Sequence, residues 1–212
     1  MIRCVTLLKN DMKTIITVQH TESVHHTNGH AGAWGNWPLT DRGKKQAFEI
    51  GKWLLQEGCN DGFVMYCSDL DRAVQTAYEI NKSLHLTPVF SEIIREVNAG
   101  EGNGKPWDWY DANKLPFNGY SADYKPFADG ESDRELWNRL LPFYNMILDG
   151  HEECILIVSH GTTLSFLQSM LMGYSLEDIE KFRFSGRSGS VSKFTIEDNG
   201  KVVANYINTK VS

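Results

Sequence analysis

The stretch TIITVQH, residues 14–20, is an apolar β-branched run that ends at His20. A second run of the same form, ILIVSHG at residues 155–161, delivers His160. The second run has no polar alternation, which is typical of a strand buried on both faces of a largely parallel sheet. Residues that follow such strands meet at the sheet edge where ligands bind. We therefore expect the two histidines to lie close together.

Strands and helices alternate along the rest of the chain. Strands are predicted at residues 14–19, 63–67, 88–90 and 155–159, followed by a hairpin of 190–196 and 201–207. Helices are predicted over 39–58, 68–85, 131–150 and 161–173. We expect Thr40 to cap the first helix, Ser68 or Asp69 to cap the second, and Pro142 to kink or divide the third. This order predicts an α/β three-layer sandwich, a mainly parallel sheet flanked by helices.

Residues 100–130 interrupt the alternation with a segment rich in Gly, Pro and aromatic residues. Long loops inside compact domains are usually functional, so we predict a short lid insertion within a single domain spanning residues 1–212. Lys105, Lys114 and Lys125 are candidate anion contacts, with a solvated position as the default for each. The aromatic side chains could line a cavity or simply cover the sheet: Trp107, Trp109, Tyr110, Phe117, Tyr120, Tyr124 and Phe127.

Charge and composition restrict the classes of binding partner that we expect. The 212 residues carry a formal net charge of −6, which repels nucleic acid and anionic membranes, so neither is an expected partner. No stretch approaches the roughly 18 apolar residues of a membrane-spanning helix, and MIRCVTLL at the N-terminus lacks a signal-peptide cleavage site. The four scattered cysteines favour reduced thiols and a cytoplasmic location. We expect a monomer or a homodimer.

A third predicted strand leads into YCSDLDRAVQTA, residues 66–77, which brings Arg72 to the start of a helix. A surface ion pair with Asp69 or Asp71 is the simplest role for this arginine. A guanidinium also matches phosphate in bidentate geometry, and helix N-termini favour anions. Together with the two histidines, Arg72 indicates a phosphate pocket at this edge.

The first strand is followed by three further histidines, His25, His26 and His30. Their spacing matches no standard zinc motif, and no HExxH or paired CxxC accompanies them. We therefore predict no metal site and no cofactor.

Six elements in order resemble the histidine phosphatase superfamily, also called phosphoglycerate-mutase-like. QHTES stands where the family has Arg-His-Gly-Glu-Ser/Thr, and PLTDRGKKQA is similar to its Pro-Leu-Thr-x-x-Gly-x-x-Gln-Ala element. YCSDLDRAVQTA, IREVNAGEGNG, DGES and VSHGTTL resemble the four that follow. The resemblance covers about residues 14–207 and implies the phosphoglycerate-mutase-like fold of the small phosphatase branch.

The resemblance also implies site residues. His20 would be the nucleophile, and Arg72 and His160 would clamp the phosphoryl oxygens. Glu96 would be the general acid, with Glu101 as the fallback; an ion pair of Glu96 with Arg95 is the alternative. The implied phosphate-binding residues are Gln19, Ser23, His26, Arg72, His160 and Gly161.

Two residues depart from the family's first motif. Gln19 replaces an arginine that contacts the phosphoryl group, and a neutral donor is about half as strong as a charged one. Thr21 replaces a glycine, which places a Cβ where special backbone geometry could be needed. A protonated His26 or His25 could restore the missing charge. Compensation, weakened activity and a dead binder all remain open.

The predicted function is a histidine acid phosphatase-type phosphoric monoester hydrolase. It would hydrolyse a small phosphorylated metabolite through a phosphohistidine at His20, with an activity that Gln19 could reduce. One alternative is a cofactor-dependent phosphoglycerate mutase, although the short insertion and the C-terminal hairpin favour a phosphatase. The other is a phospho-ligand-binding pseudoenzyme.

Overall fold

The structure is a computed structural model that describes residues 12–211. The N-terminal octapeptide MIRCVTLL and Cys4, for which predictions were made, lie outside these residues. No helix among residues 12–211 is long and apolar enough to cross a membrane. Cys59, Cys67 and Cys154, the cysteines within the described range, are free thiols.

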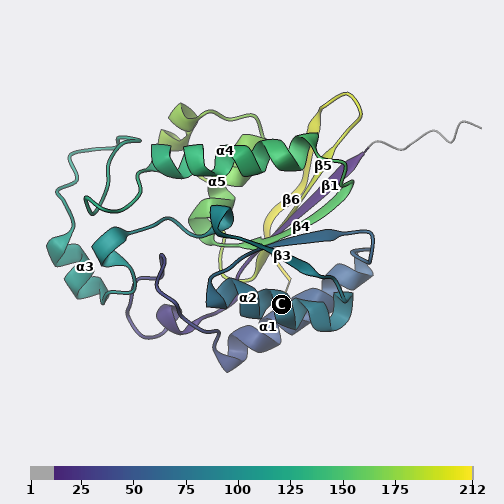
Figure 1. The fold of residues 1–212 in the computed structure, drawn as a ribbon, viewed down its shortest axis with the longest axis horizontal. Helices are drawn as coiled ribbons and strands as arrows, with labels where there is room; N and C mark the ends of the chain where they lie inside the picture. The colour runs from purple at the N-terminus through teal and green to yellow at the C-terminus, as the bar shows by residue number, and fades with distance from the viewer. Residues whose placement is uncertain (1–11, 212) are drawn as a thin grey trace, which may run out of the picture.

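A six-stranded mixed sheet in the order β3-β2-β4-β1-β5-β6 forms the centre of the molecule (Figure 1). The strands are β1 (Lys13–Gln19), β2 (Val64–Ser68), β3 (Pro88–Ser91), β4 (Cys154–Ser159), β5 (Ser190–Ile196) and β6 (Val202–Lys210). The pairs among β1 to β4 are parallel, whereas β5 is antiparallel to both of its neighbours. The predicted mainly parallel sheet is confirmed, and the C-terminal hairpin supplies its antiparallel part.

Helices cover both faces of the sheet (Figure 1). α1 (Asp41–Gln56) and α2 (Asp71–Leu84) pack on one face, and α4 (Asp133–Asp149) and α5 (Gly161–Leu171) pack on the other. The central strand β4 serves both apolar cores, because Leu156 and Val158 join the first and Ile155 and Ile157 join the second. This double burial accounts for the absence of alternation in its sequence. The three-layer α/β sandwich is confirmed.

Two helices begin with side-chain caps. The Thr40 hydroxyl accepts a hydrogen bond from the Gly43 N–H at 3.0 Å, as predicted. Ser132 and Glu135 form a reciprocal capping box at the start of α4. Pro142 lies inside α4 without dividing it. Its missing N–H costs the helix one backbone hydrogen bond, but the helix continues to Asp149 because one face is anchored in the core.

The prediction that Ser68 or Asp69 caps α2 is wrong. The residue before the helix is Leu70, which provides no side-chain cap. Both polar candidates are engaged elsewhere: the Asp69 carboxylate pairs with Arg95 at 2.7 Å (Oδ1 to Nε), and the Ser68 hydroxyl lies 2.8 Å from Nε2 of His160. Tertiary contacts thus take priority over local capping.

Residues 100–130 contain a helix that the sequence pattern did not predict, α3 (Trp107–Asn113). Short 3-10 helices occur nearby and elsewhere: η1 (Val24–His26), η2 (Glu92–Ile94), η3 (Gly100–Gly102) and η4 (Leu176–Glu180). Aromatic contacts hold the segment together, with Trp109 and Tyr110 both packed on the buried Phe127. The three lysines considered as anion contacts have other partners. Lys105 lies over the ring of Trp109, whereas Lys114 and Lys125 form ion pairs with Asp111 and Glu135.

Candidate active site

His20 and His160 lie side by side at the carboxyl ends of β1 and β4. Gln19 and Ser159 are register partners in the parallel pair, and the His20 N–H donates to the Ser159 carbonyl at 2.8 Å. The two rings are 5.1 Å apart between centroids, and both are buried. The sheet register therefore brings together the two histidines that the sequence places after these strands.

The contacts of the His20 ring determine which of its two nitrogens carries the hydrogen. Nδ1 lies 2.9 Å from the Thr21 carbonyl, which can only accept, so Nδ1 carries the hydrogen. Nε2 therefore holds the lone pair, which accepts a hydrogen bond from Nε of Arg72 at 3.1 Å. Burial, followed by the charge of Arg72, lowers the pKa of His20 well below its usual value. His20 is thus a neutral imidazole whose Nε2 carries the lone pair.

Arg72 is buried and pairs with neither Asp69 nor Asp71 in this structure. Its Nη1 donates to the Gly35 carbonyl at 2.9 Å and its Nη2 to the Ala33 carbonyl at 2.7 Å. Burial lowers the pKa of Arg72 to about 10, which leaves it charged near neutral pH. The loop carbonyls hold this cation against His20.

His160 has one nitrogen with a partner and one without. Its Nε2 lies 2.8 Å from the Ser68 hydroxyl, which also accepts from the Leu70 N–H at 3.4 Å. A hydroxyl can both donate and accept, so this contact fits either tautomer of His160. Nδ1 has no hydrogen-bond partner among the described residues although it is buried. Such an unpaired ring nitrogen is costly unless a ligand satisfies it.

Glu96 follows η2 in the sequence, and its carboxylate lies against the N-terminus of α5. It lines the same cavity as His20. Its Oε1 accepts from the N–H groups of Val97 and Thr163 at 3.0 and 3.1 Å, whereas Oε2 accepts from the Thr162 N–H at 3.2 Å. Oε2 therefore retains capacity for a further proton or hydrogen bond. The alternative pairing with Arg95 does not form, since Arg95 pairs with Asp69.

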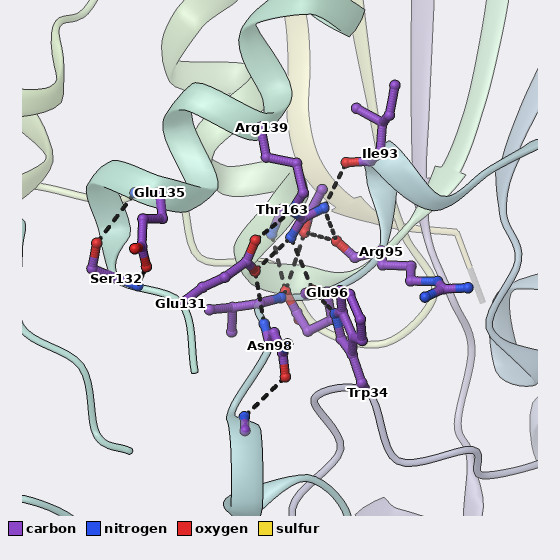
Figure 2. A network of polar contacts seen from close by, with 12 residues as sticks. Trp34, Ile93, Arg95, Glu96, Asn98, Glu131, Ser132, Glu135, Arg139 and Thr163 are labelled. Atoms are coloured by element: carbon purple, nitrogen blue, oxygen red, sulfur yellow. Dashed lines mark hydrogen bonds and ion pairs between the residues drawn. The ribbon is translucent and has the colours of Figure 1, made fainter. Parts of the chain in front are cut away.

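Arg139 of α4 fixes the backbone that carries Glu96 (Figure 2). Its Nη1 donates to the carbonyl oxygens of Ile93 and Arg95 at 2.6 and 3.1 Å, and Nη2 donates to that of Glu96 at 3.1 Å. Glu131 holds the guanidinium in place through bonds of 2.6 and 2.8 Å. A bidentate pair with three carbonyl contacts gives this segment a defined position.

His25 and His26 stand beside His20 but do not supply a positive charge. Their ring centroids are 5.7 and 5.4 Å from that of His20. Burial, His26 and Arg72 lower the pKa of His25 to about 3, and burial and Arg72 lower the pKa of His26. Both rings are therefore neutral near pH 7, and the predicted cationic compensation for Gln19 is not supported.

The geometry of His20, His25 and His26 is compatible with a metal ion, since one nitrogen from each lies within 4.8 Å of the others. Two of the nitrogen lone pairs that would have to bind the metal ion already accept hydrogen bonds. Nε2 of His20 accepts from Arg72, and Nδ1 of His26 accepts from the Ser23 N–H at 3.1 Å. These contacts argue against a metal and leave the prediction of no metal site in place.

The remaining predicted residues divide into two groups. Gln19 and Gly161 line the cavity, and their side-by-side placement is tight, because a Cβ on Gly161 would lie 3.2 Å from Nε2 of Gln19. Ser23 does not line it, and its buried hydroxyl lies 2.5 Å from Nδ1 of His25. Thr21 is buried on Thr76 with a φ outside the left-handed region, so its Cβ is tolerated.

The cavity at this edge has a volume of about 700 Å³. Trp107 and Tyr110 of the 100–130 segment contribute to its wall, whereas Glu101 lines a separate, smaller cavity and is not placed to act as the acid. Four polar lining residues were not predicted: Thr162, Ser165, Arg183 and Ser185. The first two follow VSHG on α5 and could have been inferred from the helix period, but Arg183 and Ser185 belong to an irregular segment without a motif.

The family model described as histidine phosphatase superfamily (branch 1) matches residues 15–209. The chain belongs to this superfamily. A protein of Hydrogenobacter thermophilus provisionally named phosphoserine phosphatase 2 is 31% identical over 79% of this chain and 83% of its own length. A 2,3-bisphosphoglycerate-dependent phosphoglycerate mutase of Bartonella tribocorum is 26% identical over 79% of this chain and 85% of its own length.

Two solved structures share the fold of this chain. The alpha-ribazole phosphatase from Shigella flexneri superposes with a TM-score of 0.76 at 25% identity, covering 93% of this chain and 96% of that one. A structure titled mycobacterial hydrolase 1 reaches a TM-score of 0.80 at 16% identity, covering 94% and 99%. The second likeness concerns the fold alone. The phosphoglycerate-mutase-like architecture expected from the sequence is thereby confirmed.

Proposed function

We propose that this chain is a phosphomonoesterase that hydrolyses a small phosphorylated metabolite through a phosphohistidine at His20. The observation that carries the proposal is the Nε2 lone pair of His20, which accepts a hydrogen bond from the cation of Arg72 and lies beside His160, whose buried Nδ1 is unpaired. A nucleophile flanked by a cation and a donor is what phosphoryl transfer requires. Membership in the superfamily supports it.

In the first step, Nε2 of His20 attacks phosphorus and the bond between phosphorus and the ester oxygen breaks. Arg72 transfers its Nε hydrogen bond from His20 to a phosphoryl oxygen, while the Nδ1–H of His160 donates to another. Glu96, protonated at Oε2, gives its proton to the leaving alkoxide. In the second step Glu96 removes a proton from water, the water oxygen attacks phosphorus, and the P–N bond returns its electron pair to His20.

His26 contributes a neutral donor to this site rather than a charge. Because its Nδ1 accepts from the Ser23 backbone, the hydrogen of the neutral ring is on Nε2. His26 stands where the family places a phosphate-contacting asparagine, and an imidazole N–H can fill the same role. Gln19 adds another neutral donor, so Arg72 supplies the positive charge closest to the transferred group.

A pseudoenzyme is the second candidate, favoured by Gln19 at the position of a family arginine. A cofactor-dependent mutase has weaker support; a coupled assay with and without 2,3-bisphosphoglycerate separates it from a phosphatase. A cytoplasmic location and a monomeric or homodimeric state remain predictions.

Trapping the intermediate tests the proposal. The protein is mixed with a ³²P-labelled activated phosphodonor, quenched without acid, and mapped by mass spectrometry. We expect label on His20 in the unmodified protein and in His151→Ala, a control at an exposed histidine, and none in His20→Ala. Absence of label at His20, with retained ligand binding, would establish the pseudoenzyme instead.

A further inference from the structure

A second arginine lines the cavity that holds His20. Arg183 lies in the irregular segment that follows η4, together with Phe184, Ser185 and Gly186 of the same wall. Arg72 enters from α2 on one face of the sheet, whereas Arg183 packs against α4 and α5 on the other face. The cavity thus receives two cations from opposite layers of the sandwich.

Arg183 is held in place without using all of its donors. One Nη donates to the carboxylate of Asp133 at the start of α4. The guanidinium lies over the rings of Phe166 and Tyr120, with its central carbon 5.6 and 5.8 Å from the ring centroids. Aromatic faces fix the plane of a guanidinium and leave its edge N–H groups available for a planar anion.

A buried hydroxyl in the same cavity lacks a partner. Ser165 of α5 is 5% exposed, and its Oγ has no hydrogen-bond partner among the described residues. Buried hydroxyls in native proteins nearly always have one, so a ligand atom is the natural candidate. Phe166, which supports Arg183, is the next residue along the helix.

The ionisable residues of the cavity indicate which kind of ligand group would bind beside Arg183. Among the described residues that line the cavity, Arg72 and Arg183 are the arginines and Glu96 is the carboxyl side chain. Arg72 is committed to the phosphoryl group under the proposed function. Arg183 is already paired with Asp133, so it offers less net positive charge than an unpaired arginine, which suits a monoanion better than a second phosphate dianion.

We propose that Arg183 and Ser165 form a subsite for a carboxylate on the substrate, so that this enzyme prefers phosphomonoesters that also carry a carboxylate. The inference rests on the proposed function, since it assigns the phosphoryl group to His20 and Arg72. The flat, two-oxygen carboxylate matches the guanidinium edge, and the Ser165 hydroxyl supplies an additional donor.

Two phosphate esters that differ by the carboxylate test the subsite. O-phosphoserine and O-phosphoethanolamine both release a primary alcohol with an amine on the next carbon, and only the first bears a carboxylate. We expect Arg183→Gln to lower kcat/KM for phosphoserine by about 10- to 100-fold, the worth of a charged hydrogen-bonded contact. The value for phosphoethanolamine should be unchanged. Ser165→Ala should act in the same direction with a smaller loss.

Arg187→Gln is the matched control, because Arg187 is an exposed cation of the same segment that does not line the cavity. Arg183→Lys, which keeps the charge without the planar fork, should lose most of the preference while folding normally. Equal losses for both esters, or no loss for phosphoserine, would overturn the subsite.

Binding measurements separate this inference from the proposed function. Calorimetric titration of His20→Ala with each ester reports the carboxylate preference without turnover. If no phosphohistidine forms but phosphoserine still binds more tightly and Arg183→Gln removes the difference, the subsite stands and the phosphatase fails. Equal affinity of both esters for the parent protein, together with equal kcat/KM, would overturn the subsite alone.

Discussion

Gln19 stands where the first motif of the superfamily has an arginine, and its amide is closely surrounded in the structure. Its amide lies between two glycines: a Cβ on Gly186 would be 2.7 Å from its Oε1, and a Cβ on Gly161 would be 3.2 Å from its Nε2. His25 and His26 are neutral, so they do not return the lost charge. Under the proposed function, the transferred phosphoryl group therefore lacks the charge that an arginine at position 19 would supply.

Restoring that cation should accelerate the reaction. We expect Gln19→Arg to raise kcat by about 10- to 100-fold, since a charged donor at the transferring phosphoryl group typically contributes this much. Steady-state kinetics on phosphoserine measures the change. Gln19→Met, of similar size but without a donor, should be slower than the parent protein. An unchanged or lower rate in Gln19→Arg, with unaltered thermal stability, would contradict this reading of the site.

The hydrogen on His26 gives a second test at this scale. If the ring acts as a neutral donor, His26→Asn should keep most of the activity, because an amide N–H can take over the bond to the phosphoryl group. His26→Ala should lose about 10- to 100-fold in kcat/KM. If the two variants lose activity equally, the ring's donor is not used. A bell-shaped pH profile that loses one limb in His26→Asn would instead indicate a titrating His26.

At the scale of elements, the segment that carries Glu96 depends on a side chain from a neighbouring helix. Arg139 reaches across from α4 to three carbonyl oxygens between residues 93 and 96 (Figure 2). A lysine keeps the charge but cannot form this set of bonds together with the bidentate pair to Glu131. Glu96 should then lose its alignment with the leaving group.

We therefore expect Arg139→Lys to lower kcat by about 10- to 100-fold for esters of ordinary alcohols, whose alkoxide needs a proton. The loss should be much smaller for p-nitrophenyl phosphate, whose leaving group needs little help. Comparing the two substrates distinguishes positioning from general destabilisation, which would affect both equally. Arg134→Lys is a matched control on the same helix, because Arg134 pairs with the exposed Asp123 outside the cavity.

At this scale, sequence patterns predict some of the elements and contacts of the site but not others. Runs of apolar residues located β1 and β4, and with them the meeting of His20 and His160, because parallel strands in register carry that information locally. The N-cap of α2 could not be predicted in this way, since Asp69 is recruited by Arg95, a residue distant in sequence. Arg183 has no motif, and its place in the cavity depends on the packing of Asp133 and Phe166.

For the whole molecule, burial of histidines at one sheet edge couples catalysis to stability. His20, His25, His26 and His160 all have a lowered pKa, chiefly because burial disfavours their charged forms. The same burial that keeps the His20 ring unprotonated makes the folded state bind fewer protons than the unfolded chain. The tautomer of each ring, which determines its chemistry, arises only when the layers assemble, so it is not readable from the sequence.

This coupling has a definite sign. Histidine in the unfolded chain has a pKa of about 6.5. Below this pH the unfolded chain binds protons that the buried rings do not bind, so the free energy of unfolding falls as the pH decreases. Above this pH the buried rings make their full contribution to the free energy of unfolding. Each fully buried ring, such as His20 or His160, contributes a slope of at most about 1.4 kcal/mol per pH unit.

Urea denaturation at pH 7.5 and 5.5 measures the effect, and His25→Gln should reduce the loss of stability between these pH values because glutamine does not titrate. His151→Gln, at an exposed histidine, should leave it unchanged. Equal stability of the parent protein at both pH values would mean that the folded rings accept protons, and that the neutral imidazole of His20 does not persist in mild acid.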